Sequence, residues 1–310
     1  MSAMAKVQKK KGDEYVAEAE KILSKKSWFS SSKERNQEEA AETLLQAANA
    51  YKVGGLNQEA GQIYSRVGSM YQAMLSNTNE AAKAYTQAAS CFKKANPADA
   101  VEAYQSAISL LTDAGRLTQA AKMSRDCAEL YESDEIAIEN QIMLAIQMYE
   151  QAADLFGMED SKGQSSNCKA KVAELSSAAL DPPDLLKAGQ IYDELGRNCL
   201  DSNLLKFNAK GYFLQSILCQ LANSDAIGAE QALQRYEGVD YTFSESREGK
   251  FARTLVECVE GFDAEGFATA CFEFDRVSKL DPWKTSMLVQ IKRSIQGEAG
   301  DGDEDDVDLT

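Results

Sequence analysis

Residues able to carry out catalysis are few in this chain of 310 residues. The sequence contains no histidine, which removes the commonest general base at neutral pH and excludes serine–histidine and cysteine–histidine nucleophiles. It contains neither a GxxxxGK[ST] phosphate-binding loop nor a GxGxxG motif after a strand. Pairs of carboxylates are plentiful, but on helix faces they are usually solvated surface. The sequence therefore argues against an enzyme and predicts no bound cofactor.

Seven cysteines lie far apart in the chain, and none belongs to a CxxC pair. This spacing, together with the missing histidine, does not fit a structural zinc site, so we expect no metal. The cysteines are Cys91, Cys127, Cys168, Cys199, Cys219, Cys258 and Cys271. We expect them to be reduced thiols in or near the core of a cytoplasmic protein.

The formal net charge of −16 argues against a nucleic-acid partner. Seven of the acidic residues follow Arg293, in a glycine-rich and aspartate-rich stretch that we expect to be disordered. Its last acids, Asp305, Asp306 and Asp308, surround Val307 and precede Leu309. Apolar residues in such a cluster suggest a short docking motif; a solvated tail with incidental apolar residues is the alternative.

Two adjacent aromatic residues, Trp28 and Phe29, lie in the serine-rich segment 24–36. Lys25 and Lys26 precede them. The aromatic rings could enter the headgroup region of a membrane while the lysines meet anionic lipid. Equally, the rings could tuck under the first helical hairpin. The residues alone leave both interpretations open.

A repeated pattern of small and aromatic residues, here called the repeat phrase, occurs about every twenty residues. It predicts the helices that carry the residues described above. Its clearest copy places Ala81, Tyr85, Ala88, Ala89 and Phe92 at offsets 0, 4, 7, 8 and 11. Other copies begin at Ala40, Ala60, Ala100, Ala120, Ala145 and, more loosely, Ala188. These offsets place the side chains on one helical stripe, and each helix needs its neighbours to bury that stripe. The sequence predicts an all-α, tetratricopeptide (TPR)-like solenoid of antiparallel helices, followed by a C-terminal helical bundle.

The chain divides into three predicted parts. Residues 1–180 form the TPR-like array, with the candidate membrane-contact loop near 24–36, residues 181–297 form the bundle, and residues 298–310 form the tail. Residues 1–12 are expected to be loose, the first helix to span about 13–24, and residues 157–166 to form a long polar connection. The repeat helices are expected to break at VGGLN, LSNTN, ANPAD and DAGR. No run of about twenty apolar residues and no secretory signal is found.

Several stretches resemble alpha-type soluble NSF attachment proteins, in order along nearly the whole chain. They are AGRLTQAAK (114–122), FKKANPADAVEAYQSAI (92–108), SNLLKFNAKGYF (202–213), FSESRE (243–248), LDPWKTSMLVQIKRSIQG (280–297) and the acidic ending with its penultimate leucine. The resemblance implies an adaptor in vesicle trafficking that binds assembled SNARE complexes. It implies that the adaptor recruits and stimulates the hexameric ATPase NSF, which disassembles the SNAREs after membrane fusion. A TPR-like scaffold for a different protein client is the alternative.

The resemblance also implies which residues face the SNARE bundle. They are Lys93, Lys94, Arg116, Lys122, Lys169, Lys171, Lys210 and Arg247, with apolar contacts from Leu204 and Phe207. Lys169 replaces a lysine that the family carries at a neighbouring position, where this chain reads Ser166–Asn167–Cys168. Such bases would grip an acidic coil by distributed, salt-sensitive attraction.

The two ends of the chain receive roles from the same resemblance. Trp28 and Phe29, with Lys25 and Lys26, match the family's membrane-contact loop. Asp305, Asp306, Asp308 and Leu309 match the ending that engages NSF. The expected location is peripheral, on the cytosolic face of endomembranes.

Overall fold

The computed structural model describes residues 2–25, 30–74, 77–133 and 138–298. Within these residues all regular structure is helical: fifteen α-helices and one short 3₁₀ helix. Contacts between Cα atoms divide the chain into two compact units, Met1–Ser165 and Ser166–Thr310, here called the N-terminal and C-terminal units. The division lies inside helix α8, upstream of the boundary at 180/181 that the sequence suggests, and that boundary stays a prediction.

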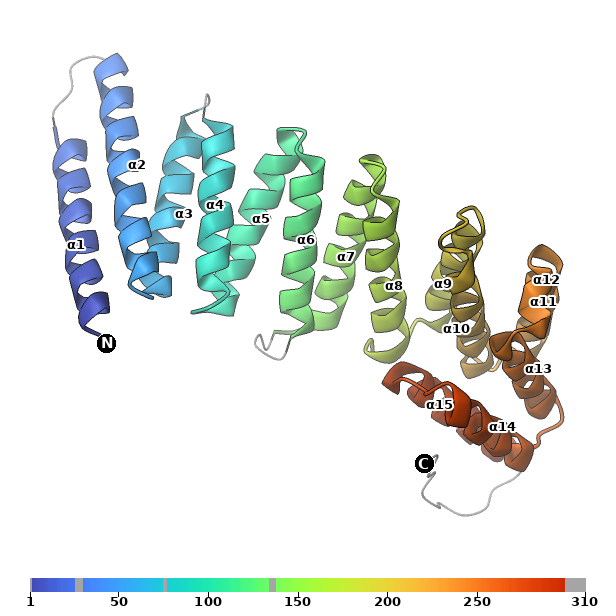
Figure 1. Cartoon of the computed structure of the whole chain (residues 1–310). Coiled ribbons are helices and arrows are strands. Elements are labelled where there is room, and N and C mark those ends of the chain that lie inside the picture. The colour runs from blue at the N-terminus through green and yellow to red at the C-terminus, as the bar shows by residue number, and fades with distance from the viewer. Residues whose placement is uncertain (1, 26–29, 75–76, 134–137, 299–310) are drawn as a thin grey trace. The chain divides into compact units, whose positions relative to one another are not determined.

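The N-terminal unit is an array of antiparallel helices in which each helix packs against the next (Figure 1). The helices are α1 (Ala3–Leu23), α2 (Ser30–Val53), α3 (Asn57–Ala73), α4 (Thr78–Phe92), α5 (Pro97–Asp113), α6 (Leu117–Glu132) and α7 (Gln141–Met158). Their ends confirm the expected breaks. Pro97, for example, lies in the first turn of α5, where the missing N–H costs no hydrogen bond.

Rings of one helix are seated on glycines of its neighbour, which explains the alternation of small and aromatic residues. A methyl group added at Gly61 of α3 would lie 2.6 Å from the ring of Phe92 on α4. One added at Gly68 would lie 2.9 Å from the ring of Tyr85. The alanines of the same phrase on α4 are buried, as is Phe92, while Tyr85 is half-buried. The stripe of the repeat is therefore the core of the array.

The first helix is longer than the sequence predicts, because α1 begins at Ala3 and includes most of the stretch expected to be loose. The Ser2 side chain caps it by accepting a hydrogen bond from the Ala5 N–H, 3.1 Å away. Lys9 pairs with Asp13 one turn later at 3.1 Å. Tyr51 of α2 donates to Asp13 at 2.7 Å, which lowers the pKa of that carboxyl. Packing against α2 thus stabilises a helix in a stretch whose lysine-rich composition suggested a loose segment.

Two further stretches that we expected to be loops are mostly helical. Residues 30–36 form the start of α2, so the part of segment 24–36 outside helices is at most 24–29. The connection expected at 157–166 shrinks to residues 159–161, because α8 already begins at Lys162. The serine and glycine content of both stretches suggested loops. These residues instead lie in the first turns of helices, where they are tolerated.

The C-terminal unit contains the remaining helices packed as a bundle (Figure 1). They are α8 (Lys162–Ala178, from Ser166 onward in this unit), α9 (Leu185–Leu200), the 3₁₀ helix η1 (Lys206–Asn208), α10 (Ala209–Ala222), α11 (Ala226–Val239), α12 (Tyr241–Glu245), α13 (Arg247–Glu260), α14 (Ala264–Val277) and α15 (Pro282–Glu298). Helix α10 contacts α9, α11, α13 and α15, so it forms the centre of the bundle.

Aromatic packing and one buried series of hydrogen bonds organise this core. Phe213 and Tyr236 stack at 4.1 Å between ring centroids, and Phe243 meets both rings edge-on. The Tyr236 hydroxyl donates to Ser216 Oγ at 2.9 Å, and Ser216 Oγ donates to the Gly189 carbonyl at 2.9 Å. Each polar group in this series has a partner, as burial requires.

Candidate functional site

Two of the expected SNARE-facing lysines, Lys93 and Lys94, lie exposed at the end of α4. Lys93 Nζ is 3.9 Å from Glu129 Oε2, near the end of α6. On the other side of α4, Lys52 in the last turn of α2 donates to Gln87 at 2.7 Å. Positive side chains at helix C-termini are favoured by the helix dipole. The ends of α2 and α4 therefore present a basic edge of the N-terminal unit.

The other two expected bases of this unit lie on α6. Lys122 is exposed and shares a helical stripe with Arg125 and Glu129, which are 3.6 Å apart between Nε and Oε1. Through Glu129 this stripe meets Lys93. Arg116 precedes the first turn of α6, about 20 Å from Glu129 at 1.5 Å per residue. The bases are spread along the helix rather than gathered in one pocket.

Helix α8 separates its two expected contact lysines. Lys169 Nζ lies 2.6 Å from Glu194 Oε1 of α9, whereas Lys171 pairs with Glu174 of its own helix at 3.3 Å. Residues two apart on a helix do not face the same way. The two lysines therefore serve different faces of α8, which their spacing in the sequence already required.

Four expected residues of the C-terminal unit lie just before α10, in its first turn and at the start of α13, and are here called the turn patch: Leu204, Phe207, Lys210 and Arg247. Leu204 is 90% exposed and Phe207 is 70% exposed. Both precede α10, in a segment that includes η1 and is held by the Lys206 N–H donating to the Ser202 carbonyl at 2.9 Å. Such large apolar side chains have no role in the core, so their exposure points to a partner.

Lys210 ties the turn patch to helix α13. Its Nζ lies 3.2 Å from Glu248 Oε2, and Glu248 follows Arg247, the first residue of α13. Ser246 caps that helix by accepting from the Gly249 N–H at 3.0 Å. Arg247 is exposed and has no ion pair with any described residue. The ion pair thus links the helix that follows the exposed apolar residues to the helix that begins with an exposed base, an arrangement suited to a surface that is both acidic and apolar.

The sequence missed three members of these surfaces. Leu205 is 44% exposed beside Leu204, and the Lys206 ammonium lies 5.4 Å from the centre of the Phe207 ring. Arg125 lies on the Lys122 stripe. Leu205 and Lys206 could have been predicted, because they lie between the expected contacts Leu204 and Phe207 in the sequence. Arg125 could be recognised only from its position three residues after Lys122 on a helix.

The expected end regions contribute little to the described structure. Lys25 is exposed directly after α1. Lys26, Trp28 and Phe29 lie outside the described residues, and so do Asp305, Asp306, Asp308 and Leu309. Their roles stay predictions.

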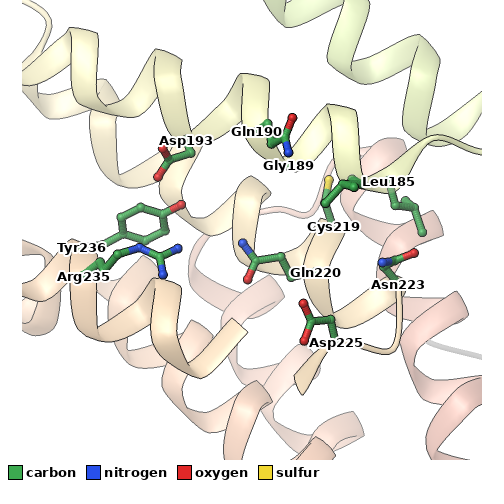
Figure 2. A pocket seen from close by; sticks show the side chains of 11 residues that line it. Leu185, Gly189, Gln190, Asp193, Cys219, Gln220, Asn223, Asp225, Arg235 and Tyr236 are labelled. Carbon is green, nitrogen blue, oxygen red and sulfur yellow. The ribbon is translucent and has the colours of Figure 1, made fainter. Parts of the chain in front are cut away.

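A pocket of about 180 Å³ lies between α9, α10 and α11 (Figure 2). Figure 2 shows Asp193, Arg235 and Tyr236 near one another at one end, and Gln220 and Asp225 farther along. Asp193 Oδ2 accepts from Arg197 at 2.9 Å, while its Oδ1 and Gln220 Oε1 are buried without a described hydrogen-bond partner.

Three of the buried cysteine thiols are poor nucleophiles at neutral pH. Burial raises the pKa of Cys219, which lines this pocket, to about 12, and has the same effect on Cys127 and Cys271. These thiols stay protonated at neutral pH, and a protonated thiol is a weak nucleophile. All seven cysteines are buried thiols, as expected. Among the described residues no group of three or more Cys, Asp or Glu is placed to hold a metal ion.

No helix in the described part of the chain combines the length and apolar character needed to cross a bilayer.

Comparison with known proteins gives one consistent result. A family model described as "Soluble NSF attachment protein, SNAP" matches residues 10–296. The chain is similar to alpha-soluble NSF attachment protein of Homo sapiens, with 37% identity over 292 residues that cover 92% of this chain and 95% of the relative. The Vitis vinifera protein of the same name is 36% identical over 297 residues, covering 96% and 98%. The Saccharomyces cerevisiae protein of that name is 34% identical over 274 residues, covering 88% and 91%.

Proposed function

This chain belongs to the soluble NSF attachment protein family, and we infer that it is that family's adaptor between assembled SNARE complexes and the ATPase NSF. It binds SNARE complexes, recruits NSF and stimulates it to disassemble them after membrane fusion. The observation that carries this conclusion is the match of residues 10–296, which spans both units. We further propose that the chain performs no chemistry itself and that ATP hydrolysis belongs entirely to NSF.

We propose that SNARE binding combines two kinds of surface. The turn patch contributes Leu204 and Phe207, whose burial against the SNARE bundle would release ordered water from a large exposed apolar area. The bases Lys93, Lys94, Arg116 and Lys122, with Lys169, Lys171, Lys210 and Arg247, supply long-range attraction to an acidic coil. All of them are exposed or half-exposed, so salt should weaken that attraction strongly.

The finer roles of the two ends are also proposals. We propose that Trp28 and Phe29, with Lys25 and Lys26, touch the membrane surface and place the adaptor on the cytosolic face of endomembranes. Tethering of this kind raises the local concentration of the adaptor near SNAREs. Asp305, Asp306, Asp308 and Leu309 would engage NSF at the opposite end of the chain. No nucleic acid is expected as a partner, since the net charge of −16 repels it.

The direct test is NSF-driven disassembly of a purified SNARE complex with and without this protein. Addition of the chain should start disassembly and raise the ATPase rate of NSF. A chain ending at Gly297, or one with Leu309→Ala, should still bind the SNARE complex but no longer stimulate NSF. An ATPase rate unchanged by the intact chain contradicts the adaptor function, and one unchanged by the tail variants contradicts only the role of the tail.

A further inference from the structure

The C-terminal unit contains an apolar groove that shares only Arg247 with the proposed SNARE surface. The groove has a volume of about 250 Å³ and lies between α13 and α14. Phe251 of α13 and Phe274 of α14 stack in it at 4.2 Å between ring centroids. Thr254, Ala270 and Val277 also line it, and Val277 is 66% exposed. Apolar area of this kind at a surface needs a partner to exclude water from it.

Basic side chains from the start of α13 line one side of this groove. They are Arg247 and Lys250, and Glu273 is the acidic residue that lines it. Lys250 lies 3.2 Å from Glu245, but both side chains are largely exposed (64% and 81%), so this pair is weak and exchangeable. A segment that carries apolar side chains among carboxylates would complement both properties.

The chain carries such a segment in its own tail. Residues 303–310 read DEDDVDLT, in which Val307 and Leu309 stand among five acidic residues. Residues two apart in an extended chain project to the same side, so both apolar side chains can enter one groove. We propose that this segment docks in the α13–α14 groove, with Val307 and Leu309 against Phe251 and Phe274. The tail carboxylates then lie beside the bases Arg247 and Lys250.

The tail is long enough to reach the groove from the end of α15. Helix α15 follows Val277 after a short connection and packs against α14 (Figure 1). Its 17 residues make it about 25 Å long, so Glu298 lies about one helix length from the Val277 end of the groove. Residues 299–309 span about 36 to 40 Å when extended. The tail therefore reaches with slack.

Docking would link the two ends of the proposed function, and this step rests on that function. While docked, the tail withholds Leu309 from NSF and covers Arg247, one of the proposed SNARE contacts. A SNARE complex that binds Arg247 displaces the tail carboxylates from it, and the released tail becomes available to NSF. The acidic tail thus imitates the acidic surface of the SNARE bundle.

A peptide-binding experiment tests the docking without NSF or SNAREs. A fluorescein-labelled peptide of residues 298–310 is titrated, by anisotropy, with the chain ending at Gly297 and with the full chain. The truncated chain should bind the peptide saturably, and the full chain about tenfold more weakly, because its own tail competes at an effective concentration in the millimolar range. Rising salt should weaken binding to both.

Surface substitutions locate the binding site. In the truncated chain, Thr254→Glu and Val277→Glu place a carboxylate in the groove at exposed positions, so both should fold normally and weaken peptide binding about tenfold. Ile227→Glu is the matched control, because Ile227 is a 72% exposed apolar residue of α11 that does not line the groove. A peptide with Val307→Ser and Leu309→Ser should lose most of its affinity.

Four outcomes would overturn the docking. They are equal peptide affinity of the full and truncated chains, an unaffected double-serine peptide, equal losses in the groove and control variants, and self-association of the truncated chain through the groove in sedimentation. Because neither SNAREs nor NSF are present, none of these outcomes bears on the adaptor function. Conversely, normal peptide docking with no NSF stimulation by the full chain would remove the adaptor function and leave the docking intact.

Discussion

At the scale of single residues, large apolar side chains of this chain fall into two classes that have different consequences. Phe213, Tyr236 and Phe243 are fully buried and stack in the core of the C-terminal unit. Leu204 and Phe207 are among the most exposed apolar residues in the described chain. Truncating the first class should lower stability, whereas truncating the second should affect only binding.

Reversing two bases tests the electrostatic part of SNARE binding. The double variant Lys122→Glu/Lys210→Glu should bind a SNARE complex about 5 to 30-fold more weakly at low salt, since two lost surface attractions amount to about 1 to 2 kcal/mol. The loss should shrink as salt screens the remaining charges. Affinity is measured by titration at low salt, about 50 mM, and at high salt, about 300 mM.

The control for this variant is Lys162→Glu, at an 87% exposed side chain outside the proposed contact set. The Lys210→Glu change places a second carboxylate beside Glu248, so thermal unfolding of both variants checks that the bundle still folds. If affinity survives the double reversal in a folded protein, the assignment of these two lysines is wrong.

Buried thiols predict loss of stability at alkaline pH. The pKa of Cys127, Cys219 and Cys271 is about 12 in the folded chain and near 9 when unfolded. Below pH 9 the thiols are protonated in both states; above it only the unfolded chain releases protons, so stability falls as pH rises from 9 toward 12. Each buried thiol should cost about 1 kcal/mol per pH unit in that range.

Denaturant unfolding at several pH values between about 8 and 11 measures this slope. The variant Cys127→Ala removes one titrating group and should fall less steeply with pH than the parent chain. Parallel slopes for the two proteins would show that Cys127 ionises equally in both states.

At the scale of elements, the contact of a ring with a glycine decides how closely adjacent helices pack. Gly61→Ala places a methyl group 2.6 Å from the Phe92 ring and should destabilise the N-terminal unit by about 1 to 3 kcal/mol. Combined with Phe92→Leu it should cost less than the two single changes together, because the smaller side chain makes room. Urea unfolding of the single and double variants gives the coupling.

Gly163→Ala is the matched control, because a methyl group at Gly163 of α8 meets nothing within 4 Å. There the change should be neutral or stabilising by up to about 1 kcal/mol, since alanine is the better helix former. Equal losses at Gly61 and Gly163 would contradict the packing account.

The helices of the array could be predicted because the repeat phrase encodes their tertiary contacts. Small residues and rings at offsets 0, 4, 7, 8 and 11 specify a stripe that only neighbouring helices can cover. Residues 1–12 and 30–36 have loop-like composition, and their helices depend on a serine cap at Ser2 and on packing of α1 against α2. Such support from another element is not visible in a local stretch of sequence.

The residues of the candidate site were proposed from the sequence and their contact roles stay predictions, whereas their geometry could not be predicted from the sequence. Family resemblance supplied Lys210 and Arg247 separately, while the Lys210–Glu248 ion pair that brings α10 to α13 depends on the folded bundle. Helical spacing alone would have shown that Lys169 and Lys171 face different ways. The α13–α14 groove joins residues from two helices and had no signal in the linear sequence.

At the scale of the whole molecule, the proposed membrane contact separates reactions in solution from reactions on vesicles. Replacing Trp28 and Phe29 with serine should leave disassembly of soluble SNARE complexes nearly unchanged. It should slow disassembly on liposomes severalfold, because the tether no longer concentrates the adaptor at the surface. Initial rates with anionic and neutral liposomes measure the effect.

The same variant distinguishes the two interpretations of these aromatics. If they tuck under the first hairpin instead, the serine variant should lose stability and activity equally in both settings. A lower melting temperature together with equal rate losses would therefore reject the membrane contact.

The neighbour-to-neighbour packing of α1 to α7 also has a mechanical consequence. Each helix makes its main contacts with the helices directly before and after it, so a small rotation at one interface adds to those at the next. The array can therefore twist gradually under an applied torque, because the rotation is distributed over all of its helix–helix interfaces. The C-terminal unit, in which α10 contacts four other helices, resists such shear. A protein that couples a motor to its load would then contain both a compliant and a stiff part.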